Sequence, residues 1–515
     1  MNMNKQVDML VVGGGINGVG IARDAAGRGL SVLLCEKDDL ASHTSSASTK
    51  LIHGGLRYLE YYEFGLVRKA LQEREVLLRA APHIISPLRF VMPHVAHLRP
   101  AWMIRIGLFF YDHLSKRNIL PGSRGINLKK HPAGAPLHDN FTKGFVYSDA
   151  WVDDARLVVL NAKDAQERGA TILTRTKLVS AKPDAQGWHA ELLNAQQKTI
   201  HIHARCIVNA TGPWASALLN NAIHSDALTP RNEVRLVKGS HIVTKKLFEH
   251  DHAYIFQNPD KRIIFAIPYL DQFTLIGTTD LEYKEDPNHV TITEDEITYL
   301  CESANTYFKQ SIHPSDVVWS YSGVRPLLEQ EDAANPSAVT RDYQLELDTP
   351  HKLAVVLSVF GGKITTFRRL AEEAVNLLTP SLGIQQPDWT ATATLPGGDI
   401  PHADFPTFCS EFQQQHAWLP VQLAKRYAHN YGTRATQLLN GAVNMAGLGE
   451  QLSPGLFELE AHYLVKHEWA QQVDDILWRR TKLGLAATPE SIQRLQQWLD
   501  HAVTTIHTEA ETHGK

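Results

Sequence analysis

Three glycines near the start of the chain have the spacing of a phosphate-binding turn. Gly13, Gly15 and Gly18 lie in the stretch VVGGGINGVG, directly after a run of apolar residues. Glycine permits a tight turn and lets the backbone approach a pyrophosphate, and a helix that follows presents N–H groups to that anion. Glu36 follows at the spacing expected of a carboxylate that binds a ribose hydroxyl. These residues together predict a dinucleotide-binding site.

A polar loop after Glu36 favours FAD over NAD as the dinucleotide. The stretch ASHTSSASTKLIHGGLRYLE (residues 41–60) carries closely spaced hydroxyl groups, then Lys50 and Gly54. Hydroxyls and backbone N–H groups at this point could reach a second phosphate and the ribityl chain of FAD. A fingerprint at the extreme N-terminus is also typical of FAD proteins of this class. A flexible Ser/Thr loop is the alternative that composition leaves open.

The elements expected around these residues belong to a parallel α/β sheet. Residues 7–15, 16–29 and 30–37 read as strand, helix and strand, because continuous apolar runs that end in glycine are typical of buried parallel strands. Strand and helix patterns recur at 157–176, 205–215 and 352–378. Residues 262–280 instead predict an antiparallel hairpin that turns at Leu270-Asp271-Gln272.

A chain of 515 residues exceeds a single core, so several domains are expected. The predicted fold class is α/β, with a discontinuous Rossmann-like FAD-binding domain at 1–80, 145–230 and 350–380. An antiparallel β-rich substrate, or cap, region is expected at 81–144 and 231–349. Residues 381–406, rich in Pro, Gly, Thr and Asp, predict a linker. Residues 407–515, including a helical pattern at 456–485, predict a C-terminal helical domain.

Composition limits the partners and the compartment. A net charge of -4 gives no overall attraction to nucleic acid, so an anionic ligand needs a local basic patch. The four cysteines lie far apart without zinc spacing, as expected of reduced residues in a cytosolic chain. We expect no signal peptide, and no apolar run approaches the roughly 20 residues that span a bilayer. His462 and His467 lie five apart, which does not place them on one helix face, so no metal is predicted.

An ordered set of motifs runs along the whole chain. It consists of GGGINGVGIARDAAGRGLSV, SSASTKLIHGGLRYLE, RPAWMIRIGLFFYDHL, WVDDARLVVLNA, NATGPWA, KGSHIV, YSGVRPL and SVFGGKITTFRRLAEEA. NATG or GGK alone is common, but this ordered set resembles the aerobic, FAD-dependent glycerol-3-phosphate dehydrogenases of the D-amino-acid-oxidase-like flavoproteins. The resemblance extends to YLVKHEWAQQVDDILWRRTKLGL near the C-terminus. It implies FAD as cofactor, glycerol 3-phosphate as substrate and a membrane quinone such as ubiquinone as electron acceptor.

The resemblance implies a position along FAD for each motif. Gly13, Gly15 and Gly18 would hold the pyrophosphate, and Glu36 the adenosine ribose. The loop near the pyrophosphate and flavin would be lined by Ser45, Ser46, Lys50 and Gly54. The adenine side would be bordered by Gly212 and Trp214, and the O2 edge of the isoalloxazine by Gly361, Gly362 and Thr365. A strand that feeds glycines into a helix start can direct N–H groups at the charge of reduced flavin.

The implied substrate is a small dianion, so its pocket needs fixed cations. The planar fork of arginine donates two parallel hydrogen bonds to phosphate. The candidates inside or near the motifs are Arg57, Arg325, Arg341 and Lys363, with Tyr58 as a further donor. Arg325 or Lys363 would also favour an alkoxide-like transition state.

The implied reaction transfers a hydride from C2 of the substrate to the flavin while a base removes the hydroxyl proton. Histidine suits that base at neutral pH. We choose His241 of KGSHIV as the catalytic base, with His53 in the flavin loop as the reserve.

Residues 99–117 predict an amphipathic helix with two possible roles. Its apolar residues and flanking basic residues suit a lipid interface, but a helix packed on its own core fits the pattern equally. The resemblance favours a peripheral protein on the cytoplasmic face of the membrane. A homodimer is a further possibility that the sequence leaves open.

The sequence is compatible to different degrees with three other functions. The nearest is a glycerol-3-phosphate oxidase that uses O2 and releases H2O2, which the sequence separates poorly from the dehydrogenase. A flavoprotein that acts on an amino acid would need fewer cations than this chain offers. A non-catalytic nucleotide-binding or tRNA-associated flavoprotein should show a basic C-terminal face, whereas residues 456–480 carry mixed charge.

Overall fold

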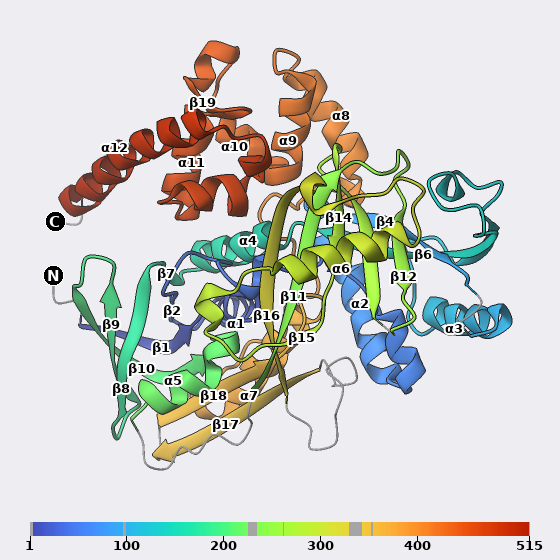
Figure 1. Cartoon of the computed structure of the whole chain (residues 1–515). Helices are drawn as coiled ribbons and strands as arrows, with labels where there is room; N and C mark the ends of the chain where they lie inside the picture. The colour runs from blue at the N-terminus through green and yellow to red at the C-terminus, as the bar shows by residue number, and fades with distance from the viewer. Residues whose placement is uncertain are drawn as a thin grey trace.

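The computed structural model describes residues 4–95, 99–224, 234–260, 262–328, 342–351 and 354–513. Two large sheets lie side by side, helices pack around them, and a group of helices from the C-terminal part lies above α4 (Asp154–Glu167) (Figure 1). The predicted arrangement of a Rossmann-like α/β part, a β-rich part and a C-terminal helical part is confirmed.

The first sheet carries the dinucleotide motif. Its strand order is β17-β18-β10-β1-β2-β7, and β9 and β8 continue from β10. The bounds are β1 Asn4–Val12, β2 Val32–Cys35, β7 Thr171–Leu173, β8 Thr176–Pro183, β9 Trp188–Asn194, β10 Thr199–Asn209, β17 Tyr343–His351 and β18 Ala354–Gly361. The strands from β18 to β7 run parallel. Their carboxyl ends therefore meet at one edge, where ligands of open α/β sheets bind.

Both faces of this sheet are covered, one by helices and the other mainly by strands. One face is covered by α1 (Ile16–Gly27), α4 and α7 (Phe367–Leu382), whose apolar residues share one core cluster with strand residues such as Met9 and Val208. The other face packs against β8, β9 and α5 (Ala215–Asn221). This burial on both faces is the reason that the strands read as continuous apolar runs.

The second sheet is mostly antiparallel. Its order is β15-β11-β14-β13-β12-β4-β6-β3, with β16 on β11 and β5 on β6. The bounds are β3 Leu51–Ile52, β4 Ile85–Pro93, β5 Arg124–Asn127, β6 Lys143–Val152, β11 Val234–Lys245, β12 Ala253–Gln257, β13 Ile263–Tyr269, β14 Phe273–Gly277, β15 Leu281–Glu282 and β16 Val317–Leu328. The predicted hairpin at 262–280 is confirmed as β13–β14. The strands β3 and β6 pair here, although the expected boundaries place most of their residues in the FAD-binding domain.

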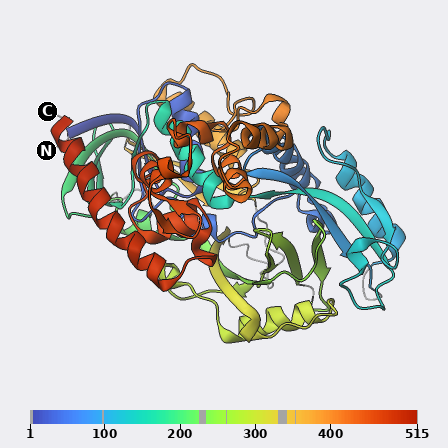
Figure 2. The ribbon, with the colours of Figure 1, turned by 90° about the horizontal axis from the view of Figure 1, so that it is seen from above.

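Three helices accompany the second sheet: α2 (Phe64–Ala80), α3 (Ala101–His113) and α6 (Glu294–Asn305). The expected amphipathic segment 99–117 is helical only in α3, so Lys116 and Arg117 lie beyond the helix end. Both views place α3 at the outer edge of the molecule, away from the C-terminal helices (Figures 1 and 2).

The C-terminal part is helical. It contains α8 Phe405–Gln415, α9 Val421–Tyr431, α10 Ala435–Leu439, α11 Glu458–Glu468, α12 Pro489–His513 and a small hairpin of β19 Gln451–Ser453 and β20 Leu456–Phe457. The helical pattern at 456–485 is interrupted, because Trp469 adopts a φ of 59° and ends α11. A separate helical turn, Asp475–Arg480, follows. The expected linker 381–406 packs on the first part of the chain, since Leu395 N–H donates to Ala80 O at 2.8 Å.

Candidate cofactor and substrate site

A cavity of about 540 Å³ lies where the parallel strands end. Its walls come from the β1–α1 turn, the loop at 41–53, the start of β8, the turn at 210–214, β16 and the turn at 361–365. The structure brings twelve of the predicted site residues to this cavity: Gly13, Gly15, Glu36, Ser45, Tyr58, Gly212, Trp214, Arg325, Gly361, Gly362, Lys363 and Thr365.

The first wall is the glycine turn between β1 and α1. Gly13 has a φ of 113°, and a Cβ there would lie 2.5 Å from Ala210 O. Gly18 does not line the cavity; a Cβ on it would lie 1.9 Å from Gly13 O, so this glycine lets α1 pack against the turn. The N-terminal turn of α1 therefore opens into the cavity, as an anion-binding helix start requires, and Ser45 Oγ accepts from its Ile16 N–H at 2.9 Å.

Glu36 ends the second strand beside this turn. Its carboxylate accepts hydrogen bonds from Gly14 N–H at 2.6 Å and Asp38 N–H at 2.9 Å. Burial raises the pKa of Glu36, although these two backbone donors act in the opposite direction. The carboxylate is thus fixed at the cavity wall, where it can accept from a sugar hydroxyl.

Two further segments complete the cofactor walls. Trp214 follows Gly212, whose φ is 58°, and its ring lies 4.7 Å from the ring of His43. Beside the first turn of α1, where Asn17 Nδ2 donates to Gly361 O at 3.3 Å, Gly361 and Gly362 have φ values of 73° and 101°. Thr365 accepts a hydrogen bond from the backbone N–H of His53 at 3.2 Å, which ties the 361–365 turn to the loop after β3.

Cationic side chains line the same cavity. The Arg325 guanidinium pairs with Asp280 and donates to Thr278 Oγ1 at 3.0 Å. The Lys363 ammonium lies 4.0 Å from the ring centroid of Tyr58. These contacts fix two cationic groups, Arg325 and Lys363, at the wall of the cavity that the glycine turns also line.

Two predicted arginines are not placed at the cavity. Arg57 precedes Tyr58 but does not line the cavity, and its guanidinium donates to Tyr61 Oη at 3.3 Å. Arg341 lies outside the described residues.

His241 lies behind the cavity wall and is 1% exposed. Its Nε2 is 2.9 Å from Thr49 Oγ1, and its ring stacks on Tyr321 at 4.8 Å. Thr49 itself lines the cavity, whereas His241 does not. Burial, followed by the charges of Arg325 and Lys50, holds the pKa of His241 well below its usual value, so the imidazole is neutral. The reserve base His53 lines the cavity directly.

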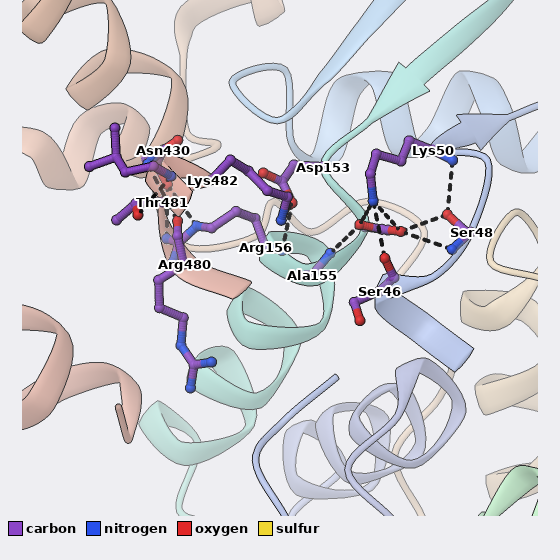
Figure 3. A network of polar contacts seen from close by, with 12 residues as sticks. Ser46, Ser48, Lys50, Asp153, Ala155, Arg156, Asn430, Arg480, Thr481 and Lys482 are labelled. Carbon is purple, nitrogen blue, oxygen red and sulfur yellow. Dashed lines mark hydrogen bonds and ion pairs between the residues drawn. The ribbon is translucent and has the colours of Figure 1, made fainter. Parts of the chain in front are cut away.

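Lys50 differs from its predicted position, because its ammonium turns away from the main cavity. It lies 2.8 and 2.9 Å from the two carboxylate oxygens of Asp154 and donates to Ser46 O at 3.1 Å (Figure 3). Both members of the pair are almost completely buried, and a buried charge without a partner is costly. The lysine therefore anchors the loop at 44–50 from behind.

Ser46 and Gly54 also lie away from the main cavity. Ser46 lines a second cavity of about 400 Å³, between the loop at 42–50 and the C-terminal part. Gly54 is packed, since a Cβ there would lie 2.6 Å from Leu71 Cδ2 and Tyr111 Oη.

The C-terminal part contacts the same loop region through buried ion pairs. The Lys482 ammonium lies 3.0 Å from Asp153 Oδ1 (Figure 3). Asp153 directly precedes Asp154, the partner of Lys50. Arg480 bonds both carboxylate oxygens of Asp39 at 2.5 and 2.8 Å, close after Glu36. None of the residues in these two ion pairs was predicted from the sequence as a functional residue. The C-terminal helices thus hold the N-terminus of α4 and the loop that borders the cofactor cavity.

Comparison with known proteins identifies the family. Residues 8–366 match the family described as FAD dependent oxidoreductase. This chain belongs to that family. Residues 389–512 of this oxidoreductase also match the C-terminal domain of alpha-glycerophosphate oxidase. Its cofactor is FAD, and the cavity fits that group: glycine turns that side chains would fill, a helix start for the pyrophosphate and Glu36 for the ribose.

Similar proteins cover nearly the whole chain. A glycerol-3-phosphate dehydrogenase of Pseudomonas aeruginosa is 54% identical over 96% of this chain and 94% of its own. An aerobic glycerol-3-phosphate dehydrogenase of Escherichia coli is 50% identical over 96% of this chain and 97% of its own. A D-erythritol 1-phosphate dehydrogenase of Brucella abortus is 52% identical over 96% and 98%. The glycerol-3-phosphate dehydrogenase of Bacillus halodurans, whose crystal structure contains FAD, is 27% identical in sequence. The two structures match with a TM-score of 0.78 over 99% of this chain and 95% of that chain.

Within the described residues, none of the helices has the length and apolar character needed to cross a membrane.

Proposed function

We propose that this oxidoreductase oxidises sn-glycerol 3-phosphate to dihydroxyacetone phosphate and passes the electrons to a membrane quinone. The observation that carries this proposal is the pair of cations, Arg325 and Lys363, on the wall of the FAD cavity. Such cations suit a small phosphate ester. Similar proteins that are named glycerol-3-phosphate dehydrogenases support the same substrate.

FAD bound in this cavity would supply the acceptor for a hydride from C2 of the substrate, and the chain supplies binding and proton transfer. Arg325 is held in place by Asp280 and Thr278, so its guanidinium is already ordered at the cavity wall when the phosphate binds. Lys363, above Tyr58, adds a second charge to the same wall. Arg57 and Arg341 remain proposed contributors to the phosphate site.

The C2 hydroxyl proton is taken up by His241 through Thr49. The Thr49 hydroxyl reaches the cavity and lies 2.9 Å from His241 Nε2. As Thr49 Oγ1 accepts the substrate proton, its own proton moves to Nε2, so no charge is left on the hydroxyl. The depressed pKa keeps the imidazole neutral before the reaction, although burial and the charges of Arg325 and Lys50 also make it a weaker base than a free histidine.

D-erythritol 1-phosphate is a second candidate substrate. One similar protein is named for it, at 52% identity. D-erythritol 1-phosphate carries the same phosphate group on a longer polyol. The cations at the cavity wall would bind either phosphate, so they do not discriminate between the two substrates. The ratio of kcat/KM for the two phosphate esters decides between them, and a ratio well above one for glycerol 3-phosphate supports our proposal.

An exposed apolar surface supports a membrane position for electron transfer. On α3 it consists of Trp102, Met103, Ile106, Phe109 and Phe110, between 36% and 63% exposed. The surface continues on Tyr61, Tyr62 and Phe64, and the rings of Phe64 and Phe110 lie 6.3 Å apart. An exposed apolar patch of this kind with nearby basic residues suits a lipid interface. We propose that α3 places the enzyme on the cytoplasmic face of a membrane, beside its quinone.

Anaerobic mixing of the holoenzyme with glycerol 3-phosphate tests the proposal. The oxidised flavin band should bleach, then recover on addition of a quinone analogue and only slowly in air. Rapid recovery in air with release of H2O2 would support the oxidase alternative. A flavin band that does not change with either phosphate ester would contradict the proposed substrates.

A further inference from the structure

Two histidines and one aspartate meet at the edge of the first sheet, far from the cofactor cavity. Asp184 lies in the turn between β8 and β9, and its Oδ2 is 2.7 Å from His189 Nε2 and 3.2 Å from His203 Nε2. The two histidine rings lie 4.9 Å apart at 71°. Within the described part of the chain, these residues form the one group of three possible ligand atoms within 4.8 Å of one another.

Strand pairing builds this group. His189 of β9 and His203 of β10 are direct partners in the antiparallel register, so their side chains share a face. The β8–β9 turn is pressed against β10 at Gly187, where a Cβ would lie 2.3 Å from Ala204 O. This close approach places Asp184 next to both rings.

The orientation of Asp184 is fixed by its backbone contacts. Its Oδ1 accepts from Gln186 N–H at 2.7 Å and Gly187 N–H at 2.8 Å. Oδ2 is thereby directed at the histidines. Ligands whose orientation is held by further hydrogen bonds are typical of metal sites.

We propose that Asp184, His189 and His203 bind a divalent transition metal ion of the zinc class. Two imidazole nitrogens and one carboxylate oxygen are a ligand set for Zn²⁺, with ligand distances near 2.0–2.2 Å that need only small side-chain movements. The His189 side chain is 68% exposed, so water can complete the coordination. No metal motif is visible in the sequence, because the ligands come from a turn and two paired strands rather than from one helix.

The bound ion would clip the β8–β9 turn to β10. Leu178, near the start of β8, lines the cofactor cavity, but Asp184 follows six residues later at the opposite end of the strand. At a rise of about 3.3 Å per residue, this separation is roughly 20 Å. The ion therefore serves the edge of the fold and does not take part in the flavin reaction.

Equilibrium dialysis of chelator-treated holoenzyme against Zn²⁺ tests the assignment, with Co²⁺ absorption as a report of the ligand set. We expect one tightly bound Zn²⁺ per chain and affinity at least about tenfold weaker in Asp184→Asn, His189→Gln and His203→Gln. His201→Gln is the matched control, because His201 lies on the same strand beside Glu191 at 3.9 Å and belongs to no such triad.

The expected result includes unchanged activity and flavin content in all four variants. Zinc affinity equal to that of the wild type in the three ligand variants would overturn the assignment. So would the absence of bound Zn²⁺ from the wild-type protein, or an equal loss in His201→Gln.

Discussion

Asp153 and Asp154 are adjacent in the chain, but their carboxylates bond lysines from two different parts of the fold. Asp153 lies 3.0 Å from Lys482 of the C-terminal part, and Asp154 lies 2.8 Å from Lys50 of the cofactor loop. Asp153 also caps the first turn of α4 through Arg156 N–H at 3.1 Å. The start of α4 is therefore the point at which the C-terminal helices are joined to the loop beside FAD.

Lys482→Met should destabilise the protein strongly. It leaves Asp153 buried without its counter-ion, and loss of one partner of a buried pair costs about 3–5 kcal/mol. Arg434→Met is the matched control, since Arg434 also joins the C-terminal part to α4, through Glu167, but both side chains are 33% exposed. Such a surface pair contributes about 0–1 kcal/mol. Urea unfolding of both holoproteins measures the difference, and equal losses would contradict the prediction.

His241→Ala should lower kcat by about 10²–10⁴-fold, the range for loss of a general base. Flavin content should stay near that of the wild type, because His241 does not line the cavity. Stopped-flow flavin reduction measures the step directly. Normal turnover in this variant would place the base elsewhere, with His53 as the first alternative.

The relay through Thr49 makes a separate prediction. Thr49→Val removes the hydroxyl that connects the cavity to His241 Nε2, whereas Thr49→Ser keeps it. We expect slow flavin reduction in Thr49→Val and near-normal reduction in Thr49→Ser. Equal rates in the two variants would mean that the proton takes another route.

Arg325→Ala should mainly raise the KM for glycerol 3-phosphate. A hydrogen bond to a charged group contributes about 1.5–3 kcal/mol, which corresponds to roughly a 10- to 150-fold change. Oxidation of glycerol, which has no phosphate, is the control and should change much less. Steady-state kinetics with both substrates measure the effect, and an unchanged KM would remove Arg325 from the phosphate site.

The local parts of the site could be predicted from sequence, and the contacts between distant segments could not. The β1–α1 turn and Glu36 lie within one βαβ unit, so spacing alone places them together. Thr49 and His241 are separated by 192 positions, and no local pattern shows that the threonine lies in front of the histidine. The orientation of Lys50 likewise depends on Asp154, which reaches it through the packing of α4.

The sequence pattern also could not predict whether the apolar side of α3 is buried or exposed. The amphipathic period of residues 99–117 predicts an apolar side on the helix, but a buried side and an exposed one have the same period. The exposed surface depends on a second segment that packs beside α3. This segment follows Leu56–Tyr61, and its aromatic residues Tyr62 and Phe64 extend the apolar surface of α3.

Phe109→Glu should weaken binding to anionic lipid vesicles, because Phe109 is 54% exposed at the centre of the α3 surface. A carboxylate there opposes both burial in the interface and attraction to anionic lipid. Val443→Glu is the control, since Val443 is 75% exposed in the C-terminal part. Vesicle sedimentation should show a loss for Phe109→Glu alone, and an equal loss in both variants would argue against α3 as the membrane contact.

His83 should make the protein less stable in acid. The side chain is 1% exposed, and among the described residues neither ring nitrogen has a hydrogen-bond partner. Burial, with smaller effects from Arg156 and His429, lowers the pKa of His83 to about 3. Below the unfolded pKa of about 6.5, the unfolded chain binds a proton that the folded protein excludes, so stability falls as the pH falls.

This residue alone should lower the free energy of unfolding by up to about 1.4 kcal/mol for each pH unit below about 6.5. His83→Leu removes the titrating group and should flatten that slope by the same amount. Urea unfolding of both proteins from pH about 7.5 to about 4.5 measures this slope. The highest pH is the reference, because His83 is then neutral in both the folded and the unfolded chain. Parallel slopes would show that the imidazole is protonated within the folded protein.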